Sequence, residues 1–266
     1  MARRLSAIGY QLSVASLVMG LATSCGAGGQ RTAPDPRAAA AVLDMDAAEA
    51  FEALRQGLLD QRFVRVDFSV EADTGRTADL SGALWLGPQN RAWLRASGTF
   101  AGDSVAPGAI SDGTRMVYGR DAQTDFSTPV ATPPALNNAV VVGFFGMGIL
   151  HNLAMLTADQ PPDHADGGAA AWVTAHDLAW GTPEERGGRT LRPLTFAIQV
   201  DAQPSGTAAL WLDAETGLPS ERTQTVAFPD GTMEVVERYR AWRFARPPVG
   251  FVLPPGVPAD STTVVP

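Results

Sequence analysis

The chain of 266 residues carries a formal charge of −8, from 28 acidic and 20 basic residues, and its length suits one domain. Every basic residue is arginine, which excludes chemistry that needs a lysine, such as P-loop phosphate binding or a Schiff base. Nucleic-acid binding requires the opposite charge balance, so we expect no nucleic-acid partner.

The first 24 residues have the organisation of a secretory signal peptide. Arg3 and Arg4 form a short basic start, a mostly apolar stretch runs from Leu12 to Leu21, and small residues lead to Cys25. Cys25 is the single cysteine, so it can form no disulfide within the chain. We therefore expect cleavage before Cys25 and lipidation of its thiol. A conventional signal peptide with an incidental cysteine and an uncleaved helical anchor are the alternatives.

The junction LATSC at residues 21–25 resembles the lipobox of bacterial lipoproteins, although its leucine lies one position further from the cysteine than usual. The resemblance implies attachment to a membrane through N-terminal acyl chains, which anchor a protein stably when there are two or more. By similarity to the sorting rule of enteric bacteria, Gly26 implies the outer membrane, facing the periplasm. Residues 25–42 are rich in Gly, Ala and Pro and are expected to form a tether.

The folded region is expected to begin with a helix. Asp46 and Glu49 have the spacing of a capping box. Apolar side chains then recur at helical spacing through about residue 62, at Ala47, Phe51, Leu54 and Leu58. Such a stripe needs a sheet or another helix to cover it.

Strands follow the helix. Alternating apolar and polar residues predict a strand over 63–72 with one wet face. Further strands are expected at 79–86, 91–99, 114–119, 170–175, 191–201, 206–212, 222–228 and 232–244, with a last edge strand at 251–253. Short turns separate several of them, so consecutive strands can pair as antiparallel hairpins. The tail over 258–266 is expected to be disordered.

A segment without charge interrupts this rhythm. Residues 126–158 contain no charged side chain, and 139–150 are continuously apolar. Three interpretations remain open: a membrane-spanning helix, an ordinary buried core helix, or a mobile apolar helix across the mouth of a cavity. Twelve apolar residues are few for a span of about 20. The glycines and methionine of the segment suit a surface that repacks around a ligand.

Together these elements predict a mainly β fold with helices (α+β). We expect roughly nine to eleven antiparallel strands in a strongly curved sheet that forms an unclosed β-barrel. The N-terminal helix and the inserted apolar helix are expected to lie over its concave face.

Several local motifs resemble the bacterial lipoprotein-carrier superfamily, which has a LolA/LolB-like fold. They are GALWL at 82–86, ISDG at 110–113, ALWLDAETGLPSERTQTVAF at 209–228, and the run 234–244 followed by FVLP at 251–254. Over residues 43–257 the resemblance implies an unclosed barrel that encloses a hydrophobic cavity for acyl chains. It adds a lipid or lipoprotein acyl chain as the expected ligand; the protein partner stays unknown.

Apolar side chains are the candidate site residues. Those placed in or over the cavity are Trp85, Trp93, Phe144, Phe145, Met147, Leu150 and Leu153, and the alternative for each is a plain core position. No catalytic residue and no cofactor is expected, because no nucleophile-elbow or zinc-protease motif occurs. The acidic loop 163–168 around His164 is interpreted as a solvated turn rather than a metal site, and His151 as a core residue.

Three functional hypotheses follow. The first is a membrane-anchored lipoprotein that binds lipid or acyl chains, with a role in lipoprotein or lipid trafficking at the cell envelope. The second is a structural or interaction lipoprotein filled by its own side chains. The third is an enzyme. A large empty cavity would favour the first, a filled interior with an exposed apolar patch the second, and converging polar groups in a cleft the third.

Overall fold

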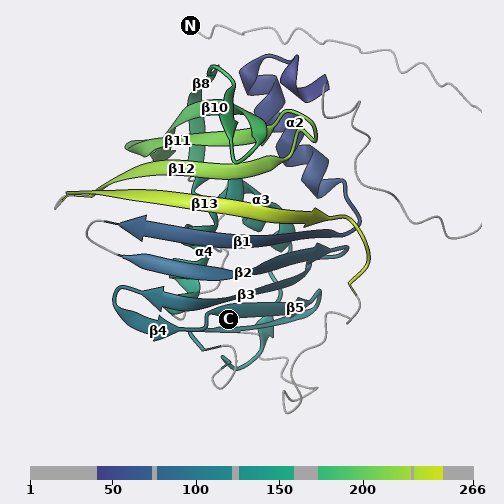
Figure 1. The fold of residues 1–266 in the computed structure, drawn as a ribbon. Helices are drawn as coiled ribbons and strands as arrows, with labels where there is room; N and C mark the ends of the chain where they lie inside the picture. Colours follow the sequence, from purple (N-terminus) through teal and green to yellow (C-terminus); the bar gives the residue numbers. More distant parts are fainter. Residues whose placement is uncertain (1–40, 74–76, 122–125, 159–172, 229–230, 248–266) are drawn as a thin grey trace, which may run out of the picture. The chain divides into compact units, whose positions relative to one another are not determined.

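The computed structural model describes residues 41–73, 77–121, 126–158, 173–228 and 231–247. Within these residues the chain forms one antiparallel sheet of thirteen strands, with helices packed against one side of it (Figure 1). The path across the sheet is β7-β6-β5-β3-β2-β1-β13-β12-β11-β10-β8, with β4 beside β3 and β9 beside β10. The two ends of this path do not pair with each other in the described part, so the curved sheet stays unclosed.

The helices are α2 (Ala47–Leu59), α3 (Leu136–Gly146) and α4 (Ile149–Thr157). The strands are β1 (Val64–Asp73), β2 (Ala78–Gly87), β3 (Arg91–Phe100), β4 (Asp103–Val105), β5 (Gly108–Asp112), β6 (Arg115–Gly119), β7 (Val130–Ala131), β8 (Val173–Trp180), β9 (Glu184–Arg186), β10 (Arg189–Val200), β11 (Gln203–Asp213), β12 (Pro219–Phe228) and β13 (Gly231–Arg243).

The two faces of the sheet differ because successive strand residues point to opposite sides. In β1, Val64, Val66 and Phe68 belong to the hydrophobic core, whereas Arg65 and Asp67 point the other way. We call the core side, which carries the helices, the inner face, and the opposite side the outer face.

Helix α2 begins where the capping pattern predicts. The Asp46 carboxylate accepts the N–H of Ala48 at 2.9 Å, which satisfies a donor that the first turn leaves free. Of the predicted stripe, Ala47, Leu54 and Leu58 are buried, whereas Phe51 is half-buried.

The fold class predicted from the sequence is confirmed, with differences in detail. The expected single apolar helix is two helices, α3 and α4, which meet at a bend of 117°. Four short strands that the sequence did not indicate, β4, β5, β7 and β9, bring the number of strands in the described part to thirteen. The strand expected at 170–175 runs from Val173 to Trp180. The predicted signal peptide, Cys25, most of the tether, and the tail after residue 247 lie outside the described residues.

Candidate functional site on the inner face

The apolar helical segment, defined as α3 and α4 with the two residues between them, lies on the inner face. The N-cap residue of neither helix supplies a capping side chain, since the cap positions are Ala135 and Gly148. Gly148 has φ of +84°, a backbone conformation that favours glycine, and the chain turns sharply there. We call residues 146–149 the helix corner.

A strand side chain takes the place of the missing cap of α4. The Glu237 carboxylate on β13 accepts the N–H groups of Ile149 and Leu150, each at 3.0 Å. Glu237 is fully buried and also accepts the hydroxyl of Tyr239 at 2.6 Å. A carboxylate at a helix N-terminus is favourable because the helix dipole is positive there. The sheet therefore supplies the cap that the sequence of α4 lacks.

A buried arginine holds the other side of the corner. The Arg222 guanidinium on β12 donates a hydrogen bond from Nη2 to the carbonyl oxygen of Gly146, at 2.8 Å. Its Nη1 donates a second hydrogen bond, to Gln224 Oε1. Arg222 lies directly opposite Glu237 in the strand register, and neither is exposed. Burial lowers the pKa of Arg222, an effect that the nearby Glu237 charge opposes. Burial also raises the pKa of Tyr239 well above its usual 10.0, and the Glu237 charge acts in the same direction.

The corner fits these charged groups only because residue 148 has no side chain. A Cβ on Gly148 would lie 2.4 Å from Glu237 Oε1 and 2.6 Å from Arg222 Nη1. Two buried donors in this region, Arg222 Nε and Asn152 Nδ2, make no hydrogen bond within the described residues. The corner is thus a small polar site enclosed by apolar side chains.

Phe144 and Phe145, which precede the corner on α3, pack against other aromatic rings. Phe144 lies 4.8 Å from the Tyr239 ring and 5.9 Å from the Trp242 ring, between centroids. Phe145 lies 5.7 Å from Phe51 of α2, in an edge-to-face arrangement. These contacts join α2, α3 and β13 into one apolar cluster.

An apolar groove opens beside this cluster. It has a volume of about 180 Å³ and runs between α2 and the turn that joins β11 to β12. Leu54 and Leu58 line one side, Leu218 and Pro219 the other, and Phe145 lies in its lining. Ligand pockets usually measure about 300–1,000 Å³. The groove in this conformation is therefore a shallow opening, smaller than a site for a whole acyl chain.

The structure divides the seven candidate residues between the two faces. Phe144, Phe145, Leu150 and Leu153 are buried on the inner face, between 0 and 6 % exposed. Met147 is half-buried at the end of α3 and packs against the same core.

Trp85 and Trp93 lie on the outer face, so their assignment to an inner cavity is corrected. They are register partners on β2 and β3, and the Arg65 guanidinium lies over the Trp85 ring at 4.8 Å. The core on that stretch of β2 is formed by Leu84 and Leu86, which alternate with Trp85.

Sequence reasoning missed the polar residues of the corner, although a signal was present. Met233, Val235, Glu237 and Tyr239 form one alternating series on β13, and Glu237 is the charged member of an otherwise apolar face. Arg222 and Gln224 occupy the matching positions on β12. Charged residues in the apolar phase of a strand indicate a buried polar site, because unpaired buried charge is costly.

Other chemistry has little support in the described part of the chain. No three His, Cys, Asp or Glu side chains there are grouped to hold a metal ion. His176 and Asp177 form an exposed pair at 2.8 Å on β8, and His151 lies on α4. The loop 163–168 with His164 lies outside the described residues.

Among described helices none alone has the length and apolarity to span a membrane; α3 and α4 meet these criteria only as a bent pair.

Comparison with known proteins identifies fold neighbours. No protein-family model matches the sequence, and no curated protein is similar to it. A LolA superfamily protein from Nitrosomonas europaea is 9 % identical with a TM-score of 0.33; the match covers 77 % of this chain and 96 % of that one. A domain from Vibrio parahaemolyticus, described as a putative outer membrane lipoprotein-sorting protein domain, is 7 % identical with a TM-score of 0.28, over 79 % of this chain and 93 % of that one.

The MucA/MucB complex of Pseudomonas aeruginosa contains a chain that is 15 % identical, with a TM-score of 0.33 over 77 % of this chain. This chain spans only 56 % of that one. One of these similar structures is of a LolA superfamily protein, and the sequence motifs of this chain resemble the same superfamily. At such low identities and TM-scores they carry no statement about what this chain binds.

Proposed function

We propose that this chain is an exported, lipid-anchored protein of the cell envelope that takes up an acyl chain between α2 and the apolar helical segment. The observation that carries the proposal is the apolar groove. It is lined by Leu54, Leu58, Leu218 and Phe145, and it leads from the surface toward the aromatic cluster on the inner face.

Uptake of a whole chain requires the apolar helical segment to move, because Phe144, Phe145 and Leu153 fill the space beneath it. The helix corner makes that movement less costly than an entirely apolar contact would. Arg222 and Glu237 are charged groups without exposure, and opening would return them to water. The unpaired Arg222 Nε and Asn152 Nδ2 would gain partners at the same time.

The anchor is proposed on the sequence features alone: the signal-like first 24 residues and the single Cys25. An attached lipid would hold the groove close to a membrane surface, where acyl chains are abundant. An outer-membrane location facing the periplasm is part of the same proposal. The intact mass of the mature chain tests it. A chain beginning at acylated Cys25 supports the anchor, and an unmodified N-terminus contradicts it.

A second candidate is an interaction lipoprotein without a ligand. The filled inner face favours it, since the four buried candidate residues leave no room for cargo in this conformation. The two candidate functions differ in whether a lipid acyl chain enters the groove.

Photo-crosslinking in intact cells separates these candidates. The full chain would carry p-benzoylphenylalanine in place of Leu218, which is half-buried in the groove lining. The matched control has the same replacement at Val130, an exposed apolar residue on β7. Uptake predicts lipid adducts at position 218 that are absent or much weaker at position 130.

A second variant checks the route. Leu218→Asp introduces a charge into the groove lining without touching the buried core, whereas Val130→Asp introduces the same charge elsewhere. The proposal predicts that only the first reduces co-purifying lipid. Adducts at position 218 that contain protein but no lipid would overturn uptake and favour the ligand-free candidate.

A further inference from the structure

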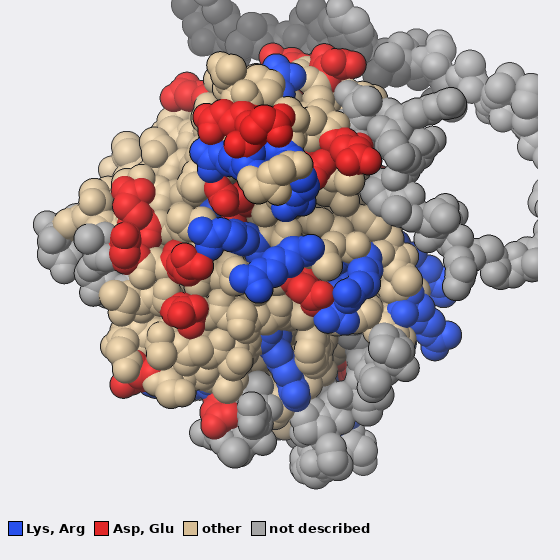
Figure 2. Space-filling view, in the orientation of Figure 1, with Lys and Arg blue, Asp and Glu red and all other residues tan. Residues whose placement is uncertain are grey.

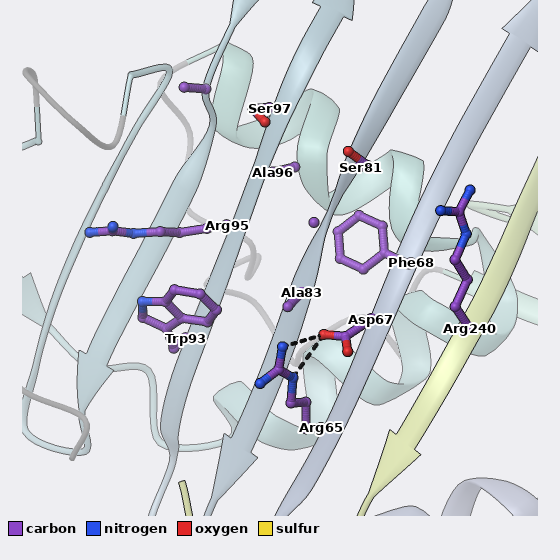
Figure 3. Close-up of a pocket in the computed structure, with 12 residues that line it drawn as sticks. Arg65, Asp67, Phe68, Ser81, Ala83, Trp93, Arg95, Ala96, Ser97 and Arg240 are labelled. Atoms are coloured by element: carbon purple, nitrogen blue, oxygen red, sulfur yellow. Dashed lines mark hydrogen bonds and ion pairs between the residues drawn. The ribbon is translucent and has the colours of Figure 1, made fainter. Parts of the chain in front are cut away.

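The outer face carries a groove that the inner-face site does not use. It crosses β13, β1, β2 and β3, has a volume of about 470 Å³, and is drawn in Figure 3. Its central surface is formed by small side chains, including Ser81, Ala83 and Ser97. Ser81 and Ser97 are register partners on β2 and β3, and both hydroxyls are exposed. This arrangement leaves a shallow channel, which we call the outer groove.

Arginines border the outer groove on both sides. Arg240 projects from β13 on one side and Arg95 from β3 on the other, and Arg65 lies between them on β1 (Figure 3). The lining contains a single carboxylate, Asp67. Its formal charge is therefore positive in a chain whose total charge is −8. Figure 2 shows arginine side chains gathered across the middle of this face.

The groove carboxylate, Asp67, already accepts hydrogen bonds from arginines. Asp67 Oδ1 accepts Nε–H of Arg65 at 2.7 Å, and Oδ2 accepts from Arg243 at 3.2 Å. Arg65 is further held over the Trp85 ring. Asp67 thus pairs with Arg65 and Arg243 and makes no ion pair with the two arginines at the borders.

The two border arginines have no ion-pair partner in the described part of the chain. Arg95 lies over two aromatic rings, with its guanidinium carbon 5.6 Å from the Trp93 centroid and 5.8 Å from that of Phe126. Its Nε is buried and has no hydrogen-bond acceptor among the residues that the structure describes. Arg240 is exposed, and its one hydrogen bond to a described residue is to Ser69 Oγ, at 3.2 Å. Both guanidinium groups therefore keep donors for an external anion.

We propose that the outer groove binds an extended acidic segment of a partner protein. Arg95 and Arg240 stand three strand spacings apart, about 14 Å, since neighbouring strands lie ~4.8 Å apart. Four residues of an extended peptide span about 13 Å, so two carboxylates at i and i+4 match the two borders. Arginine pairs with such carboxylates through two parallel hydrogen bonds. The serine hydroxyls between the borders suit a polar peptide backbone.

Other anionic occupants fit less well. A single phosphate ion is too small to meet both borders at once. An anionic membrane would be repelled by the rest of this acidic chain, and a flat bilayer surface does not fill a channel. Both are outcomes that the experiment must distinguish from an acidic peptide.

Fluorescence anisotropy tests the proposal with the full chain held in a lipid nanodisc of neutral lipids. The probe is a fluorescein-labelled Gly/Ser peptide with two aspartates at positions i and i+4. One comparison peptide has asparagines in their place, and another has the two aspartates adjacent. Arg95→Gln and Arg240→Gln are the groove variants. The matched control is Arg62→Gln, which removes one exposed arginine outside the groove lining.

The proposal predicts that each groove variant weakens binding of the spaced peptide about tenfold or more, as expected for a charge-assisted hydrogen bond. Arg62→Gln should change it by less than about twofold. Equal binding of the asparagine peptide, or equal weakening by Arg62→Gln, would overturn the proposal. So would competition by millimolar inorganic phosphate as strong as by the peptide. Binding to vesicles with anionic lipid, without peptide binding, would assign the groove to a membrane instead.

Discussion

Strands β12 and β13 carry two oppositely charged pairs one residue apart, one on each face of the sheet. Arg222 lies opposite Glu237 on the inner face, and Glu221 lies opposite Arg238 on the outer face. The inner pair has no exposure. The outer pair has side chains 18 and 42 % exposed, with 3.7 Å between Arg238 Nε and Glu221 Oε2.

The same two residue types therefore have different structural roles on the two faces. The inner charges are surrounded by apolar side chains and are hydrogen-bonded to the backbone of the helix corner, at Gly146 and Ile149, and of the next residue, Leu150. The outer charges are close to water, where ion pairs contribute little. Burial decides whether a charged pair fixes structure or remains available to a partner.

The largest expected effect comes from breaking the inner pair. Arg222→Met leaves Glu237 buried without its opposite charge and should lower the free energy of unfolding by about 3–5 kcal/mol. Arg238→Met, the matched change on the outer face, should cost about 1 kcal/mol or less. Chemical denaturation of both variants measures the difference.

The double variant Arg222→Met with Glu237→Leu refines this result. Since no buried charge is left alone, it should recover part of the loss seen in Arg222→Met. Equal losses from Arg222→Met and Arg238→Met would show that burial does not distinguish the pairs.

Substitutions at two separate glycines test how tightly the helix corner is packed. Gly148→Ala would bring a Cβ against both inner charges at positive φ, and should cost about 3 kcal/mol or more. Gly187→Ala also has positive φ, +59°, but meets nothing within 4 Å, so it should cost only about 1 kcal/mol. Thermal or chemical unfolding gives both values. A similar loss at the two positions would mean that the corner yields to the added methyl.

Tyr239 links the inner charges to pH. Tyr239→Phe removes a hydrogen bond to a buried carboxylate and should cost about 2 kcal/mol at neutral pH. Because burial raises the pKa of Tyr239 in the folded state, its contribution is present below pH 10 and is lost as pH rises above 10. Unfolding measured from pH 8 to 11 should therefore show a steeper loss in the wild type than in Tyr239→Phe. Identical slopes would contradict the buried position of this hydroxyl.

The smallest effect is expected for an exposed pair within one helix. Glu52 and Arg55 lie one turn apart on α2, and the hydrogen bond from Arg55 lowers the pKa of Glu52. Glu52→Gln should cost only about 0.3–0.5 kcal/mol at neutral pH. This contribution exists above the usual pKa of 4.5 and disappears as pH falls below it. Equilibrium unfolding at neutral and acidic pH checks it, and a loss comparable with that of Arg222→Met would invert the ranking.

Much of the fold follows from local patterns. The capping residue Asp46 and the apolar spacing of α2 predict that helix, and strict alternation predicts β1. Short turns predict the hairpins, and hence the antiparallel sheet. These signals depend only on residues that are close in sequence, so they can be recognised without knowing the distant contacts.

The site was less predictable because it depends on distant partners. Glu237 caps a helix 88 residues away in sequence; the alternation along β13 indicates that Glu237 is buried, but it does not reveal its partner. The break at Gly148 depends on the same contact. The tryptophans are a different case, since Trp85 alternates in phase with Asp79 and Ser81. That phase indicated the outer face, whereas aromatic character alone suggested the interior.

In the proposed function, the apolar helical segment is held closed at the helix corner by Glu237 and opens to admit an acyl chain. Hydrogen–deuterium exchange of the full chain in nanodiscs, with and without a long-chain fatty acid, tests it most directly. We expect the Ile149 and Leu150 amides to be protected without the fatty acid and to exchange faster when it is bound, while exchange in the central strands stays unchanged. Fatty-acid binding with unaltered protection at these two amides would contradict the claim.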